Sequence, residues 1–288
     1  MVIVVDNLRY DQWRLLYHLI GDYFLLEQEE IFCSILPTVT QYARNAMFAG
    51  MMPLEIHRHY PQYWRFDEEE GNKNDFEEQL FAGQVKRLAP GTRFAYRKVL
   101  NQREGRRILN ELNNLLQNDL VVLVYNFIDM LSHARTEMDI IRELARDEKA
   151  FRALAGTWFE HSYMYSLIQA LAEKEITLCI TTDHGSIDVE TPVKIIGDRD
   201  TTTNLRYKLG KNLNYNPKEV FAVRKPEEAQ LPRDHITSTF VFAREKQYLV
   251  YPKNLNYYSR YYKGTFQHGG ISLEEMLIPF AVLHPRGK

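Results

Sequence analysis

Runs of apolar and β-branched residues, each followed by a segment with helical spacing, constrain this fold most strongly. The clearest runs are Val2–Val5, 120–128 and 176–181. Unbroken runs of this length are typical of parallel strands that are covered on both faces. Helical patterns lie between them, including 40–49 and 106–117. This alternation predicts an α/β fold with a doubly wound, mostly parallel sheet sandwiched by helices.

The second half of the chain is less regular. A long helical pattern extends from about residue 137 to 174, and Gly156 is a candidate break within it. Further on, we expect a short helix at 272–276 and strands at 193–196, 221–223, 239–243, 248–251 and 280–283. The acidic stretch 67–78 is best explained as a solvated loop that leads into a helix.

Composition narrows the class of protein. The chain has 288 residues, 45% of them hydrophobic, and a formal net charge of -2, which argues against a protein that coats nucleic acid. Two cysteines cannot form a disulfide framework, and Cys179 is expected to be a small buried residue, so we expect a cytoplasmic protein. No apolar run approaches the roughly 18 residues of a membrane helix, so we expect no membrane partner. Because the chain opens directly on the strand sequence MVIVVD, we expect residues 1–288 to be one domain of a longer protein.

Acidic residues follow three of the predicted strands. Asp6, Asp129 and Asp183 each stand at the end of an apolar run. Singly, each could be a helix cap or form an Asx-turn. His133, however, follows Asp129 by four residues, which places the two side chains on one face of a helical turn, and His184 directly follows Asp183. The carboxyl ends of strands are where open α/β sheets collect functional groups, so we predict a site there.

A third histidine, His268, precedes a glycine pair that allows an unusual backbone and a close neighbour. Three aspartates and three histidines are too many ligands for one tetrahedral zinc ion, but they suit two metal ions with three protein ligands each. Two ions roughly 3.5–4 Å apart form a clamp for phosphoryl transfer.

A nucleophile is expected in the segment ILPTVTQYARNAMFAGMMP. Thr40 is placed at a helix N-terminus, where free N–H groups and the helix dipole favour a phosphoryl group. Its role as a plain N-cap is the alternative. The Gln41 N–H and the side chain of Asn45 or Asn126 could bind a non-bridging oxygen.

Basic residues are concentrated in the irregular part of the chain. They could form an ordinary solvated face or a funnel for an anionic substrate. They are Arg206, Lys208, Lys211, Lys218, Arg224 and Lys225. Within this cluster, Arg206 is a candidate substrate-binding residue.

The motifs, taken in order, resemble the alkaline phosphatase superfamily, and more closely its PglZ-type members. They are Asp6 after the first strand, PTVT, DMLSH, TTDHGS and QHGGISLEEMLIP, so the match covers essentially the whole chain. The resemblance implies two Zn²⁺ sites, one held by Asp6, Asp183 and His184 together with Thr40, the other by Asp129, His133 and His268.

PTVT…GMMP is also similar to the nucleophile segment of nucleotide pyrophosphatase/phosphodiesterase relatives, in which the second threonine attacks. By that match Thr40 is the nucleophile, and Thr38 is the alternative. The implied mechanism is in-line attack by the Thr40 hydroxyl on phosphorus, followed by hydrolysis of the phosphothreonine. No arginine is anchored to a motif, unless Arg44 points into the site. Because a monoester site needs positive charge for its third oxygen, we expect a phosphodiesterase for nucleotides or oligonucleotides.

A closer likeness is to the output domain of PorX-type response regulators of Bacteroidota, which are linked to type IX secretion. It rests on QYARNAMFAG and RDTTTNLRYKLGKNLNY. It implies an N-terminal receiver domain in the longer protein, and a sensor kinase or sigma factor as partner. The alternative function is a zinc-stabilised, non-catalytic signalling module that binds such a partner or forms a homodimer, with the aromatic segment NYYSRYYKGTF as its surface.

Overall fold

In the computed structural model, which describes residues 1–198, 201–253 and 255–287, the chain divides into two compact units. The first unit comprises Met1–Cys33, Gly91–Gly185 and Leu277–Lys288, and the second comprises Ser34–Pro90 and Ser186–Met276. Arg199 and Asp200, which open the RDTTTNLRY motif, lie outside the described residues. No helix of the described residues is both long and apolar enough to cross a membrane.

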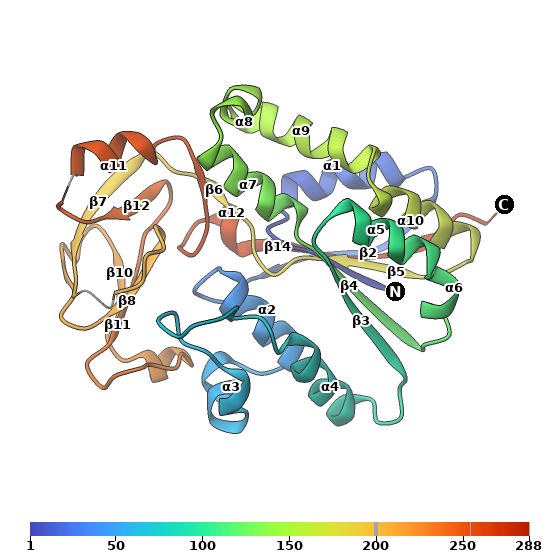
Figure 1. Ribbon diagram of the computed structural model, residues 1–288, viewed down its shortest axis with the longest axis horizontal. Helices are drawn as coiled ribbons and strands as arrows, with labels where there is room; N and C mark the ends of the chain where they lie inside the picture. Colours follow the sequence, from blue (N-terminus) through green and yellow to red (C-terminus); the bar gives the residue numbers. More distant parts are fainter. Residues whose placement is uncertain (199–200, 254, 288) are drawn as a thin grey trace. The chain divides into compact units, whose positions relative to one another are not determined.

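The first unit is built on a six-stranded sheet with the strand order β2-β14-β5-β1-β4-β3 (Figure 1). Its strands are β1 (Val2–Val5), β2 (Phe24–Cys33), β3 (Phe94–Val99), β4 (Leu120–Tyr125), β5 (Leu178–Thr181) and β14 (Leu277–Pro285). β1 pairs in parallel with β4 and β5, and β3 pairs in parallel with β4. β14 is antiparallel to both β5 and β2. One strand therefore runs against the other five, which confirms the predicted mostly parallel sheet.

Helices of the first unit connect and cover these strands. They are α1 (Tyr10–Ile20), α5 (Gln102–Asn110), α6 (Leu112–Leu115), α7 (Phe127–Glu137), α8 (Asp139–Leu144), α9 (Glu148–Glu160) and α10 (Tyr163–Glu173). α1 packs against α9 and α10, and α1 and α10 contact β14 on one face of the sheet (Figure 1). Trp13, Leu16 and Ile20 are buried along α1 at helical spacing. The predicted α/β fold is confirmed.

The second unit combines short helices with small sheets. Its helices are α2 (Thr40–Ala49), α3 (Pro53–His59), α4 (Glu77–Leu88), α11 (Leu255–Tyr261) and α12 (Leu273–Met276), with one-turn segments η1 (Pro61–Tyr63) and η2 (Pro226–Ala229). One sheet joins β10 (Phe221–Val223), β11 (Thr239–Phe242) and β8 (Tyr207–Gly210), and another joins β12 (Gln247–Val250), β7 (Thr191–Ile196) and β9 (Asn214–Tyr215). A two-stranded pair joins β13 (Phe266–Gln267) and β6 (Ile187–Asp188).

Two helical predictions are corrected. The pattern at 106–117 is broken at Glu111, which separates α5 from α6. The long pattern at 137–174 forms α8, α9 and α10, but Gly156 lies inside α9 and is not a break. A Cβ at Gly156 would lie 2.8 Å from Leu15 Cδ2, so this glycine permits the close packing of α9 on α1. Cys179 is half-buried, less enclosed than predicted.

Candidate metal centre

The first group of predicted ligands is assembled within the first unit. Asp6 follows β1, and Asp183 and His184 follow β5. Because β1 and β5 are paired in parallel, their carboxyl ends meet at one edge of the sheet. The three residues each offer a ligand atom within 4.8 Å of the others, and their side chains are at most 1% exposed.

His184 presents one ring nitrogen to both carboxylates. Its Nε2 lies 3.6 Å from Asp6 Oδ1 and 3.8 Å from Asp183 Oδ2. Its Nδ1 lies 3.1 Å from the Gly185 carbonyl oxygen, which can accept a hydrogen bond from it. A donor at Nδ1 leaves the Nε2 lone pair available to a metal, as in most histidine-ligated metal sites. The Thr182 hydroxyl donates to the His184 carbonyl and accepts from the Leu8 N–H, which holds the turn in place.

The donor set fits a divalent metal ion. Two carboxylates buried side by side are costly unless a cation compensates them. One imidazole and carboxylate oxygens, with no thiolate, suit zinc and similar first-row divalent ions. In both chemistry and burial, Asp6, Asp183 and His184 therefore fit a divalent metal ion.

Asp129 and His133 lie on α7 in the first unit. The strand predicted at 120–128 ends at Tyr125, so Asp129 stands in the first turn of a helix and not at a strand end. The predicted helical pair is confirmed, because His133 Nε2 lies 3.5 Å from Asp129 Oδ2. The His133 side chain is 62% exposed, in contrast to the buried first group.

Asn7 is a site residue that the sequence analysis missed. Its backbone is left-handed, with φ 62°, a conformation that asparagine tolerates better than most residues. Its Nδ2 donates to Asp129 Oδ1 at 3.3 Å and lies 3.3 Å from Ser132 Oγ. Its backbone N–H points at Asp183 Oδ1 over 3.5 Å. One fully buried residue thus contacts a carboxylate of each predicted ligand group, and its position next to Asp6 was the available signal.

The predicted nucleophile segment lies in the second unit. α2 begins at Thr40, but its N-cap is Val39 and no side chain caps it, so the prediction that Thr40 is a plain N-cap is wrong. Thr40 is partly exposed. Thr38 is fully buried, and its hydroxyl donates to the Gly270 carbonyl and accepts from the Gly269 N–H, each at 3.0 Å. Both functions of the Thr38 hydroxyl are therefore used internally.

His268 also lies in the second unit, in the turn predicted to have unusual backbone. Its Nδ1 lies 3.3 Å from the Thr38 carbonyl oxygen. Gly269 has φ 122°, which favours glycine. A Cβ at Gly270 would lie 2.7 Å from the Ala243 carbonyl oxygen and 2.8 Å from an Arg206 nitrogen. The glycine pair thus allows the predicted close approach, and the approaching groups are Ala243 and Arg206.

The Arg206 side chain is buried and paired inside the second unit, and it does not face solvent. It is fully buried, and its guanidinium forms a bidentate ion pair with Glu275. The Nε–Oε1 distance is 3.0 Å and the Nη2–Oε2 distance is 2.6 Å. Lys208 is also buried, with Nζ donating to the Thr202 carbonyl at 2.9 Å. The predicted basic face is therefore wrong for these two residues, because both are buried and Arg206 donates to Glu275 and to the Gln247 carbonyl.

The remaining substrate-binding candidates differ in setting. The Gln41 side chain donates to the Arg65 carbonyl, and Asn45 donates to the Lys73 carbonyl and accepts from Asn74, so both are engaged in the second unit. Asn126 precedes α7 in the first unit, and its buried Oδ1 has no hydrogen-bond partner among the described residues.

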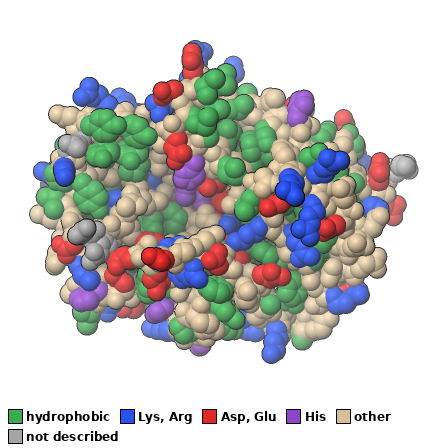
Figure 2. Space-filling view, in the orientation of Figure 1, with side chains coloured by type: hydrophobic (Ala, Val, Ile, Leu, Met, Phe, Trp, Pro, Cys, Tyr) green, Lys and Arg blue, Asp and Glu red, His purple; other side chains and the backbone are tan. Residues whose placement is uncertain are grey.

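The aromatic segment predicted as a surface forms α11 of the second unit. Tyr257, Tyr258 and Tyr261 are 59%, 38% and 36% exposed, and the rings of Tyr257 and Tyr261 stack with centroids 5.9 Å apart. Figure 2 shows hydrophobic side chains gathered near α11 on this face. Exposed aromatic clusters of this kind mark interaction surfaces more often than isolated apolar residues do.

Comparison with known proteins agrees with the fold. The chain matches, over residues 1–283, the family described as the BREX system PglZ alkaline phosphatase-like domain. Among solved structures it is similar to phosphonoacetate hydrolase from Sinorhizobium meliloti 1021 in complex with phosphonoformate, at 14% identity and a TM-score of 0.58 over 98% of this chain and 88% of that one. The phosphonoacetate complex of that enzyme gives 12% identity and a TM-score of 0.54 over the same shares. At this identity the likeness establishes a shared fold. No curated protein sequence matches the chain.

Proposed function

The chain belongs to the PglZ family of alkaline phosphatase-like domains, and on that basis we propose that it is a metal-dependent phosphoesterase. The observation that carries the proposal is the buried group Asp6, Asp183 and His184 at the carboxyl ends of β1 and β5. A structural ion pair would not need two buried carboxylates facing one imidazole nitrogen. A cation-binding site does need them.

We propose two zinc ions. Asp6, Asp183 and His184 would hold one, with Thr40 beside it. Asp129, His133 and His268 would hold the other. When bound, such ions lower the pKa of a nearby hydroxyl and stabilise charge on the reacting oxygens.

Thr40 is the proposed nucleophile. Thr40 is the first residue of α2, at the helix end where backbone N–H groups have no intrahelical partner, and such groups can hold a phosphoryl oxygen. Thr38, the alternative, is buried and uses its hydroxyl as both donor and acceptor, so it is the weaker candidate. The Thr40 oxygen would form a bond to phosphorus as the ester alcohol leaves, and water would then hydrolyse the phosphothreonine. The Gln41 N–H and Asn126 would bind a non-bridging oxygen.

A diester is the proposed substrate. Arg206 and Arg44, which could serve the third oxygen of a monoester, are both in buried ion pairs, Arg206 with Glu275 and Arg44 with Glu77 at 2.7 Å. We propose nucleotides or oligonucleotides as the substrate class, in the cytoplasm.

The test compares Thr40→Val with Thr40→Ser in the zinc-loaded protein. We expect hydrolysis of bis(p-nitrophenyl) phosphate to exceed that of p-nitrophenyl phosphate, to be abolished by Thr40→Val, and to be partly retained by Thr40→Ser. Metal content, measured by mass spectrometry, should stay at two zinc ions in the Thr40→Ser variant. Full activity of Thr40→Val would refute the nucleophile, and absence of activity in the zinc-loaded wild type on both esters would refute the enzyme.

A second candidate function is favoured by the exposed tyrosines of α11. They suit a signalling surface for a sigma factor, a sensor kinase or a second copy of the chain. The link to PorX-type regulators of type IX secretion rests on sequence motifs alone. Partner binding that survives Thr40→Val but is lost in Tyr257→Ser would favour this function.

A further inference from the structure

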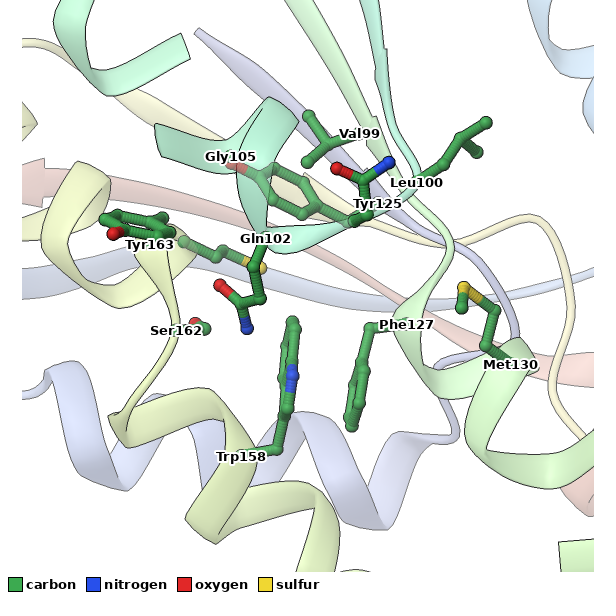
Figure 3. A pocket seen from close by; sticks show the side chains of 12 residues that line it. Val99, Leu100, Gln102, Gly105, Tyr125, Phe127, Met130, Trp158, Ser162 and Tyr163 are labelled. Carbon is green, nitrogen blue, oxygen red and sulfur yellow. The ribbon is translucent and has the colours of Figure 1, made fainter. Parts of the chain in front are cut away.

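A cavity of about 300 Å³ lies within the first unit, beside the predicted metal ligands of α7. It is bounded by the carboxyl ends of β3 and β4 and by helices α5, α7, α9 and α10 (Figure 3). This volume is at the low end of the range for small-molecule binding sites, so the cavity can hold a single ring system more easily than a peptide. Nothing in the proposed mechanism uses this cavity.

The walls of the cavity are aromatic and apolar. Phe127 and Trp158 stack on each other, with ring centroids 3.3 Å apart and an interplanar angle of 3°, and Met130 and Met164 add flexible apolar surface (Figure 3). None of the described residues that line it is charged. The cavity therefore excludes a phosphate group itself and favours a neutral, flat ligand.

Two polar groups give the cavity a way to orient such a ligand. Tyr125 is 3% exposed, and its hydroxyl has no hydrogen-bond partner among the described residues. Buried tyrosine hydroxyls usually have a partner, so this one has an unused donor and acceptor at the cavity wall. The Gln102 amide, on α5, points toward the side of the cavity where Trp158 and Ser162 lie (Figure 3). A hydroxyl and an amide are the groups that read the donor and acceptor edge of a nucleobase.

Helix α7 connects this cavity to the metal ligands. Phe127 and Met130 line the cavity, whereas Asp129 and His133 face each other on an adjacent side of the same helix. From helix geometry, the two faces are about a third of a turn apart and their side chains roughly 10 Å from each other. A base and a phosphate joined through one sugar can bridge such a separation.

We propose that this cavity binds the base of a nucleoside that remains esterified to phosphorus while the other substituent leaves. This deepens the proposed phosphodiesterase function and rests on it. The face of Trp158 that is turned away from Phe127 supplies the stacking surface, and Tyr125 and Gln102 pair with the base edge.

The first experiment uses two diesters with one leaving group. They are the p-nitrophenyl ester of thymidylate and methyl p-nitrophenyl phosphate, of which only the first can fill the cavity. We expect kcat/KM to favour the thymidylate ester by about tenfold or more, since base stacking is worth roughly 1–3 kcal/mol. Trp158→Ala should bring this ratio close to one, and the isosteric Tyr125→Phe should lower it with little disturbance of folding. Phe32→Ala, an exposed aromatic on β2 at the opposite edge of the sheet, is the matched control and should keep the ratio.

The second experiment separates the cavity from catalysis. Trp13 and Trp64 are 0% and 5% exposed and Trp158 is half-buried in the cavity, so thymidine alone should change the protein fluorescence saturably. Binding of thymidine that Tyr125→Phe weakens, with neither ester hydrolysed, would refute the phosphoesterase while supporting the cavity as a nucleoside site. Equal kcat/KM for the two esters, or a preference that Trp158→Ala leaves intact, would overturn the proposal.

Discussion

The side-chain amide of Asn7 donates a hydrogen bond to Oδ1 of Asp129 over 3.3 Å, although 122 positions separate them in sequence. The same residue directs its backbone N–H at Asp183. Asn7 therefore fixes the distance between the end of β1 and the first turn of α7. Residues that hold metal ligands in this way matter nearly as much as the ligands, because they set ligand orientation.

Replacing Asn7 should impair the site in two separable ways. Asn7→Gly removes the amide but keeps the left-handed backbone, whereas Asn7→Ala also adds strain of about 1–2 kcal/mol. We expect both variants to lose roughly 10–100-fold in zinc affinity or activity. Thermal unfolding should show a further loss of stability in Asn7→Ala alone. Equal metal affinity in Asn7→Gly and wild type would contradict this role.

Removing a ligand should lower both metal content and stability. Asp183→Asn keeps the shape of the side chain but weakens its oxygen as a ligand, so we expect loss of one zinc ion per chain by mass spectrometry. Chelation of the wild type should lower the unfolding temperature, and added zinc should restore it. A ligand present at a thousand times its Kd stabilises by about 4 kcal/mol. Asp22→Asn changes an exposed carboxylate and serves as the control. Unchanged zinc content in Asp183→Asn would rule out Asp183 as a ligand.

The strands that precede the predicted ligands could be predicted, because burial on both faces of a strand requires an unbroken run of apolar residues. β1 matches its predicted bounds, and β5 differs by two residues at its start. β2 escaped prediction. Its sequence is FLLEQEEIFC, in which the polar stretch EQEE interrupts the apolar residues. Because β2 is an edge strand and mostly exposed, it does not need a continuous apolar run. The missing strand did not affect the site, because the predicted ligands follow β1 and β5 or lie on α7.

Contacts between residues far apart in the sequence could not be predicted at the site. The His133 spacing was visible because helix geometry is local. The pairing of Arg206 with Glu275 spans 69 positions, and no local pattern indicates which arginine of a basic cluster will be buried. Asn7 was missed for a related reason, because the carboxylates that its N–H groups face, Asp129 and Asp183, lie far along the chain.

Glu275 should matter much more than its neighbour Glu274. Glu275 is fully buried, and its Oε1 accepts from both Arg206 and the Gly270 N–H, which lies in the turn that follows His268. Glu275→Gln leaves the Arg206 charge buried without its counter-ion, so we expect a loss of about 3–5 kcal/mol in the free energy of unfolding by urea titration. Glu274→Gln alters an exposed side chain and should change it by less than about 0.5 kcal/mol. A similar loss of unfolding free energy in both variants would show that the Arg206–Glu275 ion pair does not stabilise the fold.

Lys208 should make the stability of the protein depend on pH near neutrality. Burial lowers the pKa of its amine from 10.5 to about 7, while Nζ keeps the Thr202 carbonyl and the Tyr251 ring as neighbours. Between pH 7 and 8.5 the unfolded chain holds this proton and the folded chain releases it, so stability rises with pH in this window. Relative to Lys208→Met, the wild type should gain roughly 1–2 kcal/mol of unfolding free energy from pH 7 to 8.5. Lys218→Met removes an exposed amine and should preserve the wild-type pH dependence. A parallel pH dependence of wild type and Lys208→Met in urea titrations would mean that Lys208 stays protonated in the folded protein.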